Sequence, residues 1–330
     1  MSSNLTDVPF FADSDLGALK HFVHSQPAFY HTSKPTVFEG MTDEVLALVS
    51  PFVAYWAYSI FFVALDSIEA PWIHRYRIHE SAEVTSRNRV TKLGCFLWVL
   101  LQQVIQTVLG LYWMDTTEST PAFLTDIEGI RNIVIYAAQT ILGETTSNWF
   151  LLSYGASSVR FIYWWGYPIA QLVFAMFCID TWQYFWHRAF HVNRFLYKHF
   201  HSWHHRLYVP YAYGALYNHP LEGFVLDTLG TGIAHSLSGM TVRQASFLFA
   251  FSTMKTIDDH CGYRLPLDPL QLFFGNNADY HDIHHQVAGI KSNFSQPFFI
   301  HWDVILGTRM TREAMENRQR RWKEKVEKST

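Results

Sequence analysis

The chain has 330 residues, of which 17% are aromatic and 16% charged, and its formal net charge is −3 at pH 7. An average soluble domain holds roughly 25% charged residues, so this balance disfavours a soluble protein and favours a membrane protein, and the net charge gives no support to nucleic-acid binding. The scattered cysteines, Cys95, Cys178 and Cys261, predict neither a disulfide framework nor a thiolate metal site.

The first 40 residues predict an irregular leader. They are polar, contain Pro9, Pro27 and Pro35, and show no helical or strand periodicity. A removable signal peptide would start with a charged segment, followed by a short apolar core and a small-residue cleavage site, and the leader lacks this order. We therefore expect the first apolar span to act as the membrane signal itself.

Three apolar segments predict membrane-spanning helices. Residues 45–65 are uncharged and number about 20, the length that crosses a hydrocarbon core of roughly 30 Å. Residues 93–114 form a second span, whose glutamines are expected to face other helices rather than lipid. Residues 161–186 form a third span and end in aromatic residues that suit the membrane interface. The glutamines of the second span are Gln102, Gln103 and Gln106.

Two further segments are apolar but less regular. Residues 130–152 predict an amphipathic or re-entrant helix. Residues 222–257 are slightly short for two full passes, so we expect a helical hairpin that is only partly immersed in the bilayer. The residues that interrupt this hairpin are Gly230, Gly232, Gly239 and Arg243.

Together these segments predict an all-α, polytopic membrane protein with about four transmembrane helices and a cytosolic helical cap. We expect the leader at residues 1–40, membrane helices with their loops at 41–186, and a histidine-rich catalytic region that includes the hairpin at 187–310. Residues 311–330 form a basic, helix-prone tail, which is either a solvated helix or an anchor on anionic lipid.

The charges of the two short loops predict the orientation. The loop after the first span is basic, whereas residues 115–159 hold five acids and one arginine. Because cytosolic loops are enriched in lysine and arginine, the first loop is expected in the cytosol, and parity then places residues 187–218 and 260–330 there too. The charged residues are Arg75, Arg77, Arg87, Arg89 and Lys92 in the first loop, and Asp115, Glu118, Asp126, Glu128, Arg131 and Glu144 in the second.

Histidine is the outlier of the composition, with 18 residues, and three short patterns account for eight of them. The patterns, which we call the histidine boxes, are HRAFH at residues 187–191, HSWHH at 201–205 and HDIHH at 281–285. On a helix, residues three and four apart share one face, so each box is expected to point two or three imidazoles in one direction. The box histidines are His187, His191, His201, His204, His205, His281, His284 and His285.

The boxes predict a metal site. Buried neutral histidines need hydrogen-bond partners, and eight that converge without a cation would be hard to satisfy. A zinc site takes three or four protein ligands, so eight histidines exceed one ion and predict two. Imidazole suits iron, zinc and copper alike, so the spacing does not choose the metal.

Further ligands and supporting residues are expected around the boxes. His260, at the cytosolic end of the hairpin, is the best candidate for a ninth ligand, and His219 is a ligand, a supporting residue or a turn residue. Ligating imidazoles usually donate their other N–H group to a carboxylate or carbonyl, and acids near the boxes are expected to accept it or else to cap helices. These acids are Asp180, Glu222, Asp258, Asp259 and Asp282, whereas His21, His24, His31, His74, His79, His199, His235 and His301 receive no role.

The boxes, in this order and between membrane spans, resemble the membrane fatty acid hydroxylase superfamily, which includes sterol C4-methyl oxidases, fatty acid hydroxylases and sphingoid-base hydroxylases. Longer stretches resemble the fungal sphingoid-base C4-hydroxylases within it, and the resemblance covers about residues 41–310. At His219 the family pattern also admits asparagine. The stretches are DTWQYFWHR, LYKHFHSWHH, MKTIDDHCGYRLPLDP and NNADYHDIHHQ, which contain the start of the first box, the whole of the other two boxes and His260.

The resemblance implies a di-iron monooxygenase of the endoplasmic reticulum membrane, with its active site facing the cytosol. Its substrate would be sphinganine, or the dihydroceramide that contains it, and its product the 4-hydroxylated form. Electrons would come from NADPH or NADH through a reductase and cytochrome b5. The sequence agrees on one point, because it shows no haem-binding or dinucleotide-binding segment, so the electron donor is expected to be a separate protein.

Several rival functions share these features. A related lipid oxidase, such as a sterol C4-methyl oxidase, a fatty acid hydroxylase or a desaturase, would differ in its product. A zinc-dependent membrane hydrolase would work without oxygen. A metal transporter would need polar ligands at mid-membrane depth, whereas the boxes follow the ends of spans.

Cleavage of an unactivated C–H bond is beyond any side chain, so a hydroxylase would rely on its metal for that step. The alkyl chain is expected to enter between residues 161–186 and the hairpin, past Tyr208, Tyr211, Tyr213 and Tyr217.

Overall fold

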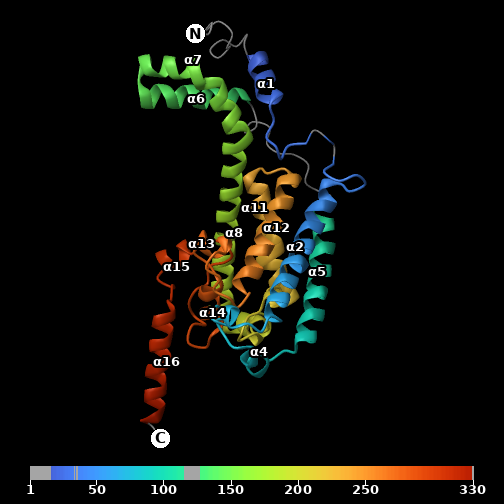
Figure 1. The fold of residues 1–330 in the computed structure, drawn as a ribbon, viewed down its shortest axis with the longest axis vertical. Coiled ribbons are helices and arrows are strands. Elements are labelled where there is room, and N and C mark those ends of the chain that lie inside the picture. The colour runs from blue at the N-terminus through green and yellow to red at the C-terminus, as the bar shows by residue number, and fades with distance from the viewer. Residues whose placement is uncertain (1–15, 33, 35, 115–126, 329–330) are drawn as a thin grey trace. The chain divides into compact units, whose positions relative to one another are not determined.

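The computed structural model describes residues 16–32, 34, 36–114 and 127–328. The regular elements among these residues are helices, with no strand. The fold class is all-α, as predicted (Figure 1). The chain forms two compact units. Unit 1 contains residues 1–40, 118–173 and 238–241, and unit 2 contains residues 41–117, 174–237 and 242–330. The loop acids Asp115, Glu118 and Asp126, on which the orientation argument drew, lie outside the described residues.

Unit 1 corrects two expectations. Residues Leu16–Ser25 form helix α1, where an irregular leader was expected, because Leu19 and Val23 lie on one helical face and are fully buried. Residues 130–152 belong to two helices, α6 (Ile127–Leu142) and α7 (Glu144–Phe161), because Gly143 adopts a φ of 73° that favours glycine and separates them. A π-helical turn, η4 (Ile162–Gly166), follows α7.

Unit 2 is built on long apolar helices that stand beside one another (Figure 1). They are α2 (Asp43–Asp66), α5 (Lys92–Met114), the part of α8 (Tyr167–Val192) from residue 174 onward, and α12 (Val242–Asp259). Hydrogen bonds connect these helices along their apolar length. One joins two side chains, and another joins a side chain to the backbone. Trp56 of α2 donates to the side chain of Gln103 of α5 at 2.8 Å, and Ser50 of α2 donates to a backbone carbonyl of α12 at 2.9 Å.

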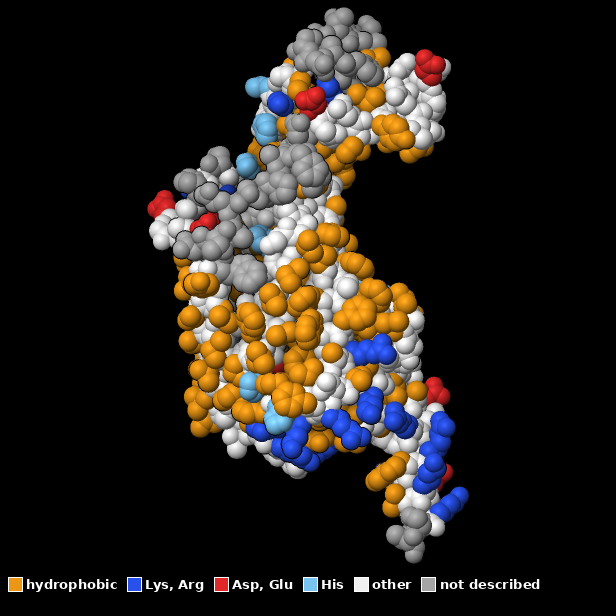
Figure 2. Space-filling model, turned by 180° about the vertical axis from the view of Figure 1, so that it is seen from behind, with side chains coloured by type: hydrophobic (Ala, Val, Ile, Leu, Met, Phe, Trp, Pro, Cys, Tyr) orange, Lys and Arg blue, Asp and Glu red, His pale blue; other side chains and the backbone are white. Residues whose placement is uncertain are grey.

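Three described helical stretches are long and apolar enough to cross a membrane, at Asp43–Asp66, Lys92–Tyr112 and Glu144–Val192. The predicted spans at 45–65 and 161–186 fall within them, and the span at 93–114 coincides with Lys92–Tyr112 except for its last two residues. Apolar side chains cover the outer face of the unit 2 helices (Figure 2). Gln102 and Gln103 are buried, as predicted. We expected about four transmembrane helices, and the described residues contain three stretches that are long and apolar enough. The number is lower because neither arm of the hairpin is long and apolar enough to cross a membrane.

The hairpin at residues 222–257 consists of short pieces. Helix α10 (Pro220–Gly223) continues through a π-helical turn, η8 (Phe224–Leu229), into α11 (Gly230–Ser238), and α12 returns. Helix α11 has only nine residues. Helix α12 ends in charged residues that are buried in the protein rather than exposed to lipid, namely Lys255, Asp258 and Asp259.

The histidine boxes lie in a cap at one end of unit 2, made of short helices and turns. The basic first loop, which contains α3 (Pro71–His74) and α4 (Ser81–Arg87), packs onto this cap. The backbone N–H of Arg89 donates to the carbonyl of Arg206 at 2.8 Å, and that of Ile78 to the carbonyl of Gly262 at 2.9 Å. The basic loop and the boxes therefore share one end of the unit, as the charge argument requires.

The C-terminal part of the cap is also helical. Helix α14 (Ala278–His285) contains the third box, and α16 (Arg312–Glu327) confirms the helix expected for the basic tail. Lysine and arginine side chains gather at this end of unit 2 and along α16 (Figure 2). The remaining short elements of the cap are α9 (Arg194–Leu196), η5 (Tyr197–His201), η6 (His204–Arg206), η7 (Ala212–Gly214), α13 (Pro269–Leu272) and α15 (His301–Ile305).

Candidate metal centre

The nine histidines predicted as metal ligands lie in two clusters, which we call sites A and B. All nine are buried, with exposed fractions between 0 and 7%. Within each cluster the candidate ligand atoms lie within 4.8 Å of one another. Site A contains His187, His191, His201, His205 and His284, and site B contains His204, His260, His281 and His285.

The local backbone decides which histidine enters which site. The first box lies on the last turns of α8, so His187 and His191 share a face and both enter site A. The third box lies on α14, where His281 and His285, four residues apart, enter site B, while His284 enters site A. Each of the last two boxes thus supplies both sites rather than pointing in one direction, which differs from the expectation.

The second box does not form a regular α-helix. His201 ends the π-helical turn η5, and His204 begins the 3-10 turn η6. His201 and His205 enter site A, and His204 enters site B. The two sites therefore share the second and third boxes, which brings them next to each other.

The separations of the ring nitrogens fit metal coordination. In site A the Nε2 atoms of His191 and His201 are 2.6 Å apart, and those of His187 and His201 are 3.2 Å apart. In site B the corresponding distance is 3.0 Å for His260 and His281. With metal–nitrogen bonds of about 2.0 to 2.1 Å, neighbouring ligands of one ion lie about 2.9 to 3.4 Å apart. The clusters thus have the dimensions of two coordination shells, with one pair closer than that range.

The positions of the protons on the histidine rings give a second argument that the two sites bind cations. Four histidines donate their Nδ1–H group to a backbone carbonyl, and because a carbonyl can only accept, their Nε2 atoms hold a lone pair rather than a proton. These unprotonated Nε2 atoms lie in the sites among the ring nitrogens of the other histidines, where each can act as a ligand to a cation. The donors are His187 to Phe294 at 2.8 Å, His260 to Thr256 at 2.8 Å, His284 to Ser292 at 2.7 Å, and His285 to Leu207 at 2.7 Å.

One predicted acid supports the centre. The Nδ1–H group of His201 donates to the carboxylate of Glu222, and both side chains are about 1% exposed. Glu222 is placed there by α10, which follows the second box. A carboxylate in this position fixes the ring orientation of a ligating histidine and raises its basicity.

The other four predicted acids accept hydrogen bonds elsewhere. Asp180 accepts backbone N–H groups of Phe298 and Phe299, and Asp282 pairs with Arg312 at 2.6 Å and with His79 at 2.7 Å. The expectation that they support ligand histidines is not met in the described structure, because backbone carbonyls take that role. His79, which received no role, is a partner of Asp282. The remaining two acids are Asp258, beside Tyr58 and Gln271, and Asp259, beside Lys255 and Asn276.

His219 lies outside both sites. It is the N-cap residue of α10, and its Nδ1 atom accepts the backbone N–H of Leu221 at 3.2 Å. Its ring packs against Phe200, with the ring centroids 4.9 Å apart. Of the roles considered from sequence, the turn residue fits this position.

Burial keeps the cap histidines uncharged. It lowers the pKa of His204 from 6.5 to about 4, and the pKa of His260 and of His284 to about 3, because the surrounding protein disfavours the charged imidazolium. A neutral imidazole is the form that binds metal. These three histidines are therefore ready to act as ligands at neutral pH.

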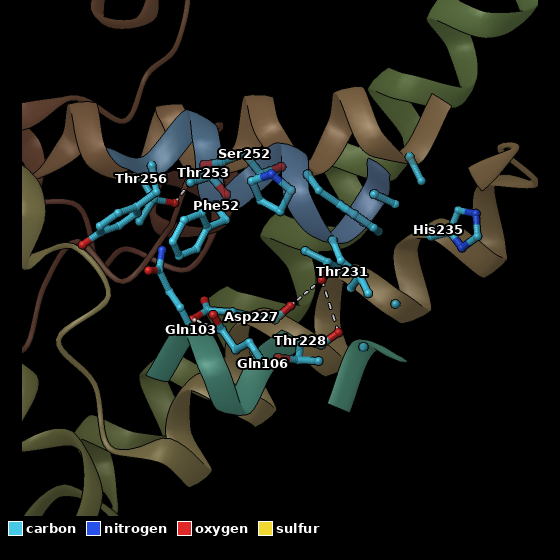
Figure 3. A pocket seen from close by; sticks show the side chains of 18 of the residues that line it. Phe52, Gln103, Gln106, Asp227, Thr228, Thr231, His235, Ser252, Thr253 and Thr256 are labelled. Carbon is cyan, nitrogen blue, oxygen red and sulfur yellow. Dashed lines mark hydrogen bonds between the residues drawn. The ribbon is translucent and has the colours of Figure 1, made fainter. Parts of the chain in front are cut away.

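A cavity of about 200 Å³ reaches toward the histidine clusters within unit 2. It is lined by α2, α5, α8 and the hairpin (Figure 3). Gln183, one helical turn before His187, lines it, and so does Thr256, whose carbonyl accepts the Nδ1–H group of His260. The tyrosines expected at its mouth do not line it, since Tyr211 and Tyr217 are buried in the core, and Tyr55 lines it instead.

Comparisons with known proteins agree with this site. Residues 172–308 match a family model described as fatty acid hydroxylase. The chain is 47% identical to a sphingolipid C4-hydroxylase of Saccharomyces cerevisiae, over 91% of this chain and 82% of the relative. It is 45% identical to a sphinganine C4-monooxygenase of Arabidopsis thaliana, over 82% of this chain and 89% of the relative.

A differently named relative is a very-long-chain aldehyde decarbonylase of Oryza sativa, 40% identical over 82% of this chain and 90% of the relative. No solved structure matches the chain. The sequence identity is high over most of both chains, and the family model matches a region that includes all three boxes. These two findings establish the family of the chain. The chain belongs to the fatty acid hydroxylase family.

Proposed function

We propose that this protein is a di-iron monooxygenase that hydroxylates C4 of sphinganine or dihydroceramide, with O2 and electrons from an external donor. The observation that supports this most is the pair of buried histidine clusters in the cap of unit 2, next to a cavity among the long helices. Relatives named as sphingolipid C4-hydroxylases or sphinganine C4-monooxygenases are 43 to 47% identical over at least 80% of this chain. The proposed reaction is therefore the one in their names.

In this proposal the nine histidines of sites A and B hold two iron ions. Iron would supply the activation of O2 and the cleavage of the C–H bond. The protein supplies the geometry: Glu222 and the carbonyls of four loops and helices fix the imidazole rings, and the cavity positions the alkyl chain and excludes water.

The electron source is proposed to be cytochrome b5 with its reductase, at the cytosolic face of the endoplasmic reticulum membrane. The cap end of unit 2 exposes Arg194 and Lys198 next to the second box. A basic surface suits an acidic redox partner, because complementary charge steers association. The same basic end would face the cytosol by the loop-charge rule.

Lipid mass spectrometry of cells without the protein, with the wild type and with His284→Ala tests the function. We expect 4-hydroxylated long-chain bases only with the wild type, and an equal amount of both proteins in the membrane. Purified wild type should contain about two iron ions per chain, as two sites predict. If cells that lack both this protein and its relatives still contain the normal amount of 4-hydroxylated long-chain bases, the proposal is rejected.

The same experiment separates the rival functions. A sterol C4-methyl oxidase, a fatty acid hydroxylase, a desaturase or an aldehyde decarbonylase would leave long-chain bases unchanged and alter sterols, fatty acids or alkanes. A zinc-dependent hydrolase would contain zinc and keep its activity without O2. A binding protein without catalytic activity would change none of these products.

A further inference from the structure

The cavity contains one carboxylate among the described residues that line it, the side chain of Asp227. Asp227 lies on the π-helical turn η8, and Figure 3 shows it beside Gln103 and Gln106 of α5. Its side chain is partly accessible although the residue lies inside the helix bundle. The carboxylate is thus presented to the cavity.

Asp227 has no cationic partner in the described part of the chain. Its polar partners are two neutral side-chain amides, those of Gln106, whose Nε2 atom lies 3.5 Å from one carboxylate oxygen, and of Asn218. Thr231 donates to the backbone carbonyl of Asp227 and not to its carboxylate. A carboxylate in a largely apolar space is costly unless a cation or several donors satisfy it. The cavity therefore offers an acceptor that a cationic ligand group would match.

The position of Asp227 places this acceptor close to site A. Gln183 donates to the backbone carbonyl of Leu226, the preceding residue, at 3.5 Å, and Gln183 lies one helical turn before His187. On the other side, Glu222 contacts His201 of site A and begins the same helical stretch, five residues before Asp227. A group bound by Asp227 would lie beside the proposed oxidation site.

The rest of the cavity has a polar and an apolar end. Along α12 the lining residues change from Val242, Ala245 and Phe249 to Ser252 and Thr256 toward His260. The distance along the helix between the first and last of these is about 21 Å at 1.5 Å per residue, enough for a long alkyl chain. The head of a lipid would therefore lie at the polar end, near the histidines, and its tail along the apolar end.

We propose that Asp227 binds the ammonium group of a free sphingoid base, and that this contact makes the free base a better substrate than its N-acylated form. The inference rests on the proposed function. In sphinganine the amine is on C2, two carbons from C4, so binding at Asp227 holds C4 near site A. The free amine is a cation at neutral pH, whereas the amide of dihydroceramide has no charge and would leave the carboxylate unpaired.

Binding and turnover of two lipids that differ in this charge and in one small acetyl group test the inference. The lipids are sphinganine and N-acetylsphinganine, and the full-length proteins are the wild type, Asp227→Asn, Asp227→Glu and Glu316→Gln. Glu316→Gln removes one exposed acid from α16, away from the cavity, and is the matched control. Dissociation constants are measured by scintillation proximity with purified protein in detergent, and 4-hydroxylated product is measured in membranes.

We expect the wild type to bind sphinganine at least about tenfold more tightly than N-acetylsphinganine, because a desolvated charge pair is lost with the amide. Asp227→Asn should weaken sphinganine binding about tenfold and change N-acetylsphinganine binding less than about twofold. Asp227→Glu, which keeps the charge, should retain the preference for the free base. Glu316→Gln should behave as the wild type.

Two results would overturn the inference: equal wild-type affinity for the two lipids, or an equal effect of Asp227→Asn on both. A failure of the proposed function is distinguishable from these. If the wild type prefers sphinganine through Asp227 but forms no 4-hydroxylated product, the binding inference stands and the reaction is wrong. If product forms but Asp227→Asn leaves the preference unchanged, the reaction stands and the inference is wrong.

Discussion

The hydrogen bonds of the Nδ1 atoms determine what the histidines can do. Five of the nine have an oxygen acceptor at Nδ1, four from carbonyls and one from Glu222. Each such contact fixes the ring and leaves Nε2 as the free ligand atom. Glu222 is the one charged acceptor among them, so its contribution can be separated from that of the neutral carbonyls.

Glu222→Gln is expected to weaken metal binding. The glutamine oxygen can still accept the proton of His201, but the negative charge that raises the basicity of the ring is lost, and changes to such partners usually cost 10- to 100-fold in metal affinity. Iron content per chain, measured during titration with a chelator, checks this. Asp258→Asn is the control, because Asp258 contacts no cluster histidine. Equal iron loss in both variants would contradict the assigned role of Glu222.

The stability of the metal-free protein should fall as the pH is lowered. His204, His260 and His284 have a folded-state pKa of about 4, 3 and 3, below the usual 6.5. Below pH 6.5 these histidines are therefore protonated in the unfolded chain but remain neutral in the folded protein. The free energy of unfolding thus decreases from about pH 6.5 toward pH 4. At pH 5 the loss is on the order of 2 kcal/mol for each histidine. The loss is measured as the difference between the midpoints of thermal unfolding at pH 7.5 and pH 5, with chelator present. An unchanged midpoint would contradict this prediction.

At the scale of elements, the sequence predicted the long helices and the identity of the clustered histidines, but not how the boxes divide between two sites. The three- and four-residue spacings are local, and they were enough to select the eight box histidines, whereas His260 was chosen from its position at the end of the hairpin. The division depends on the π-helical turn η5 and the 3-10 turn η6, which no spacing indicates. The carbonyl acceptors were also missed, because backbone atoms of Leu207, Ser292 and Phe294 leave no trace in residue identity.

The loop after α14 offers a test of this backbone contribution. The position of a Cβ atom added at Gly289 would lie 1.9 Å from the carbonyl oxygen of Ile283, so Gly289→Ala must displace either the loop or α14. That loop also provides the carbonyl of Ser292, which accepts from His284. We expect a loss of about 1 to 3 kcal/mol in stability and a lower iron content.

Gly17→Ala is the matched control for this change. Gly17 lies in α1 with no atom within 4 Å of an added Cβ, so alanine there should leave iron content unchanged and stabilise its helix slightly. Thermal unfolding and metal analysis of both purified variants measure the difference. A Gly289→Ala protein with wild-type iron content would show that the loop after α14 does not hold site A.

At the scale of the molecule, the charges and the chemistry occupy one end of unit 2. The basic first loop packs on the cap, and the cavity lies among the long helices, where Gln183 and Thr256 line it one helical turn from His187 and His260. In the proposed function, lipid would enter from the bilayer side and electrons from the water side. The loop charges predicted that the basic loop and the boxes share one end, whereas the cavity could not be predicted because it needs helices that are far apart in the chain to come together.

Charge reversal on the cap should therefore slow electron delivery without harming the site. Arg194 and Lys198 are exposed beside the second box, and replacing both with glutamate should raise the KM for cytochrome b5 about tenfold or more at low salt, because steering by complementary charge is lost. The effect should shrink as salt rises, since charge interactions are screened within about 8 Å at physiological ionic strength. Iron content and turnover with a small chemical reductant should stay at the wild-type level.

The matched control places the same charge change on α16, where Arg318 and Lys323 are also exposed. If the donor docks over the histidine cap, the Arg318→Glu, Lys323→Glu protein should keep the wild-type KM for cytochrome b5. Equal KM increases in both double variants would mean that only the overall charge matters, and an increase confined to the α16 variant would place the donor on the C-terminal helix. An effect confined to Arg194 and Lys198 assigns the docking surface to the exposed face beside the second box.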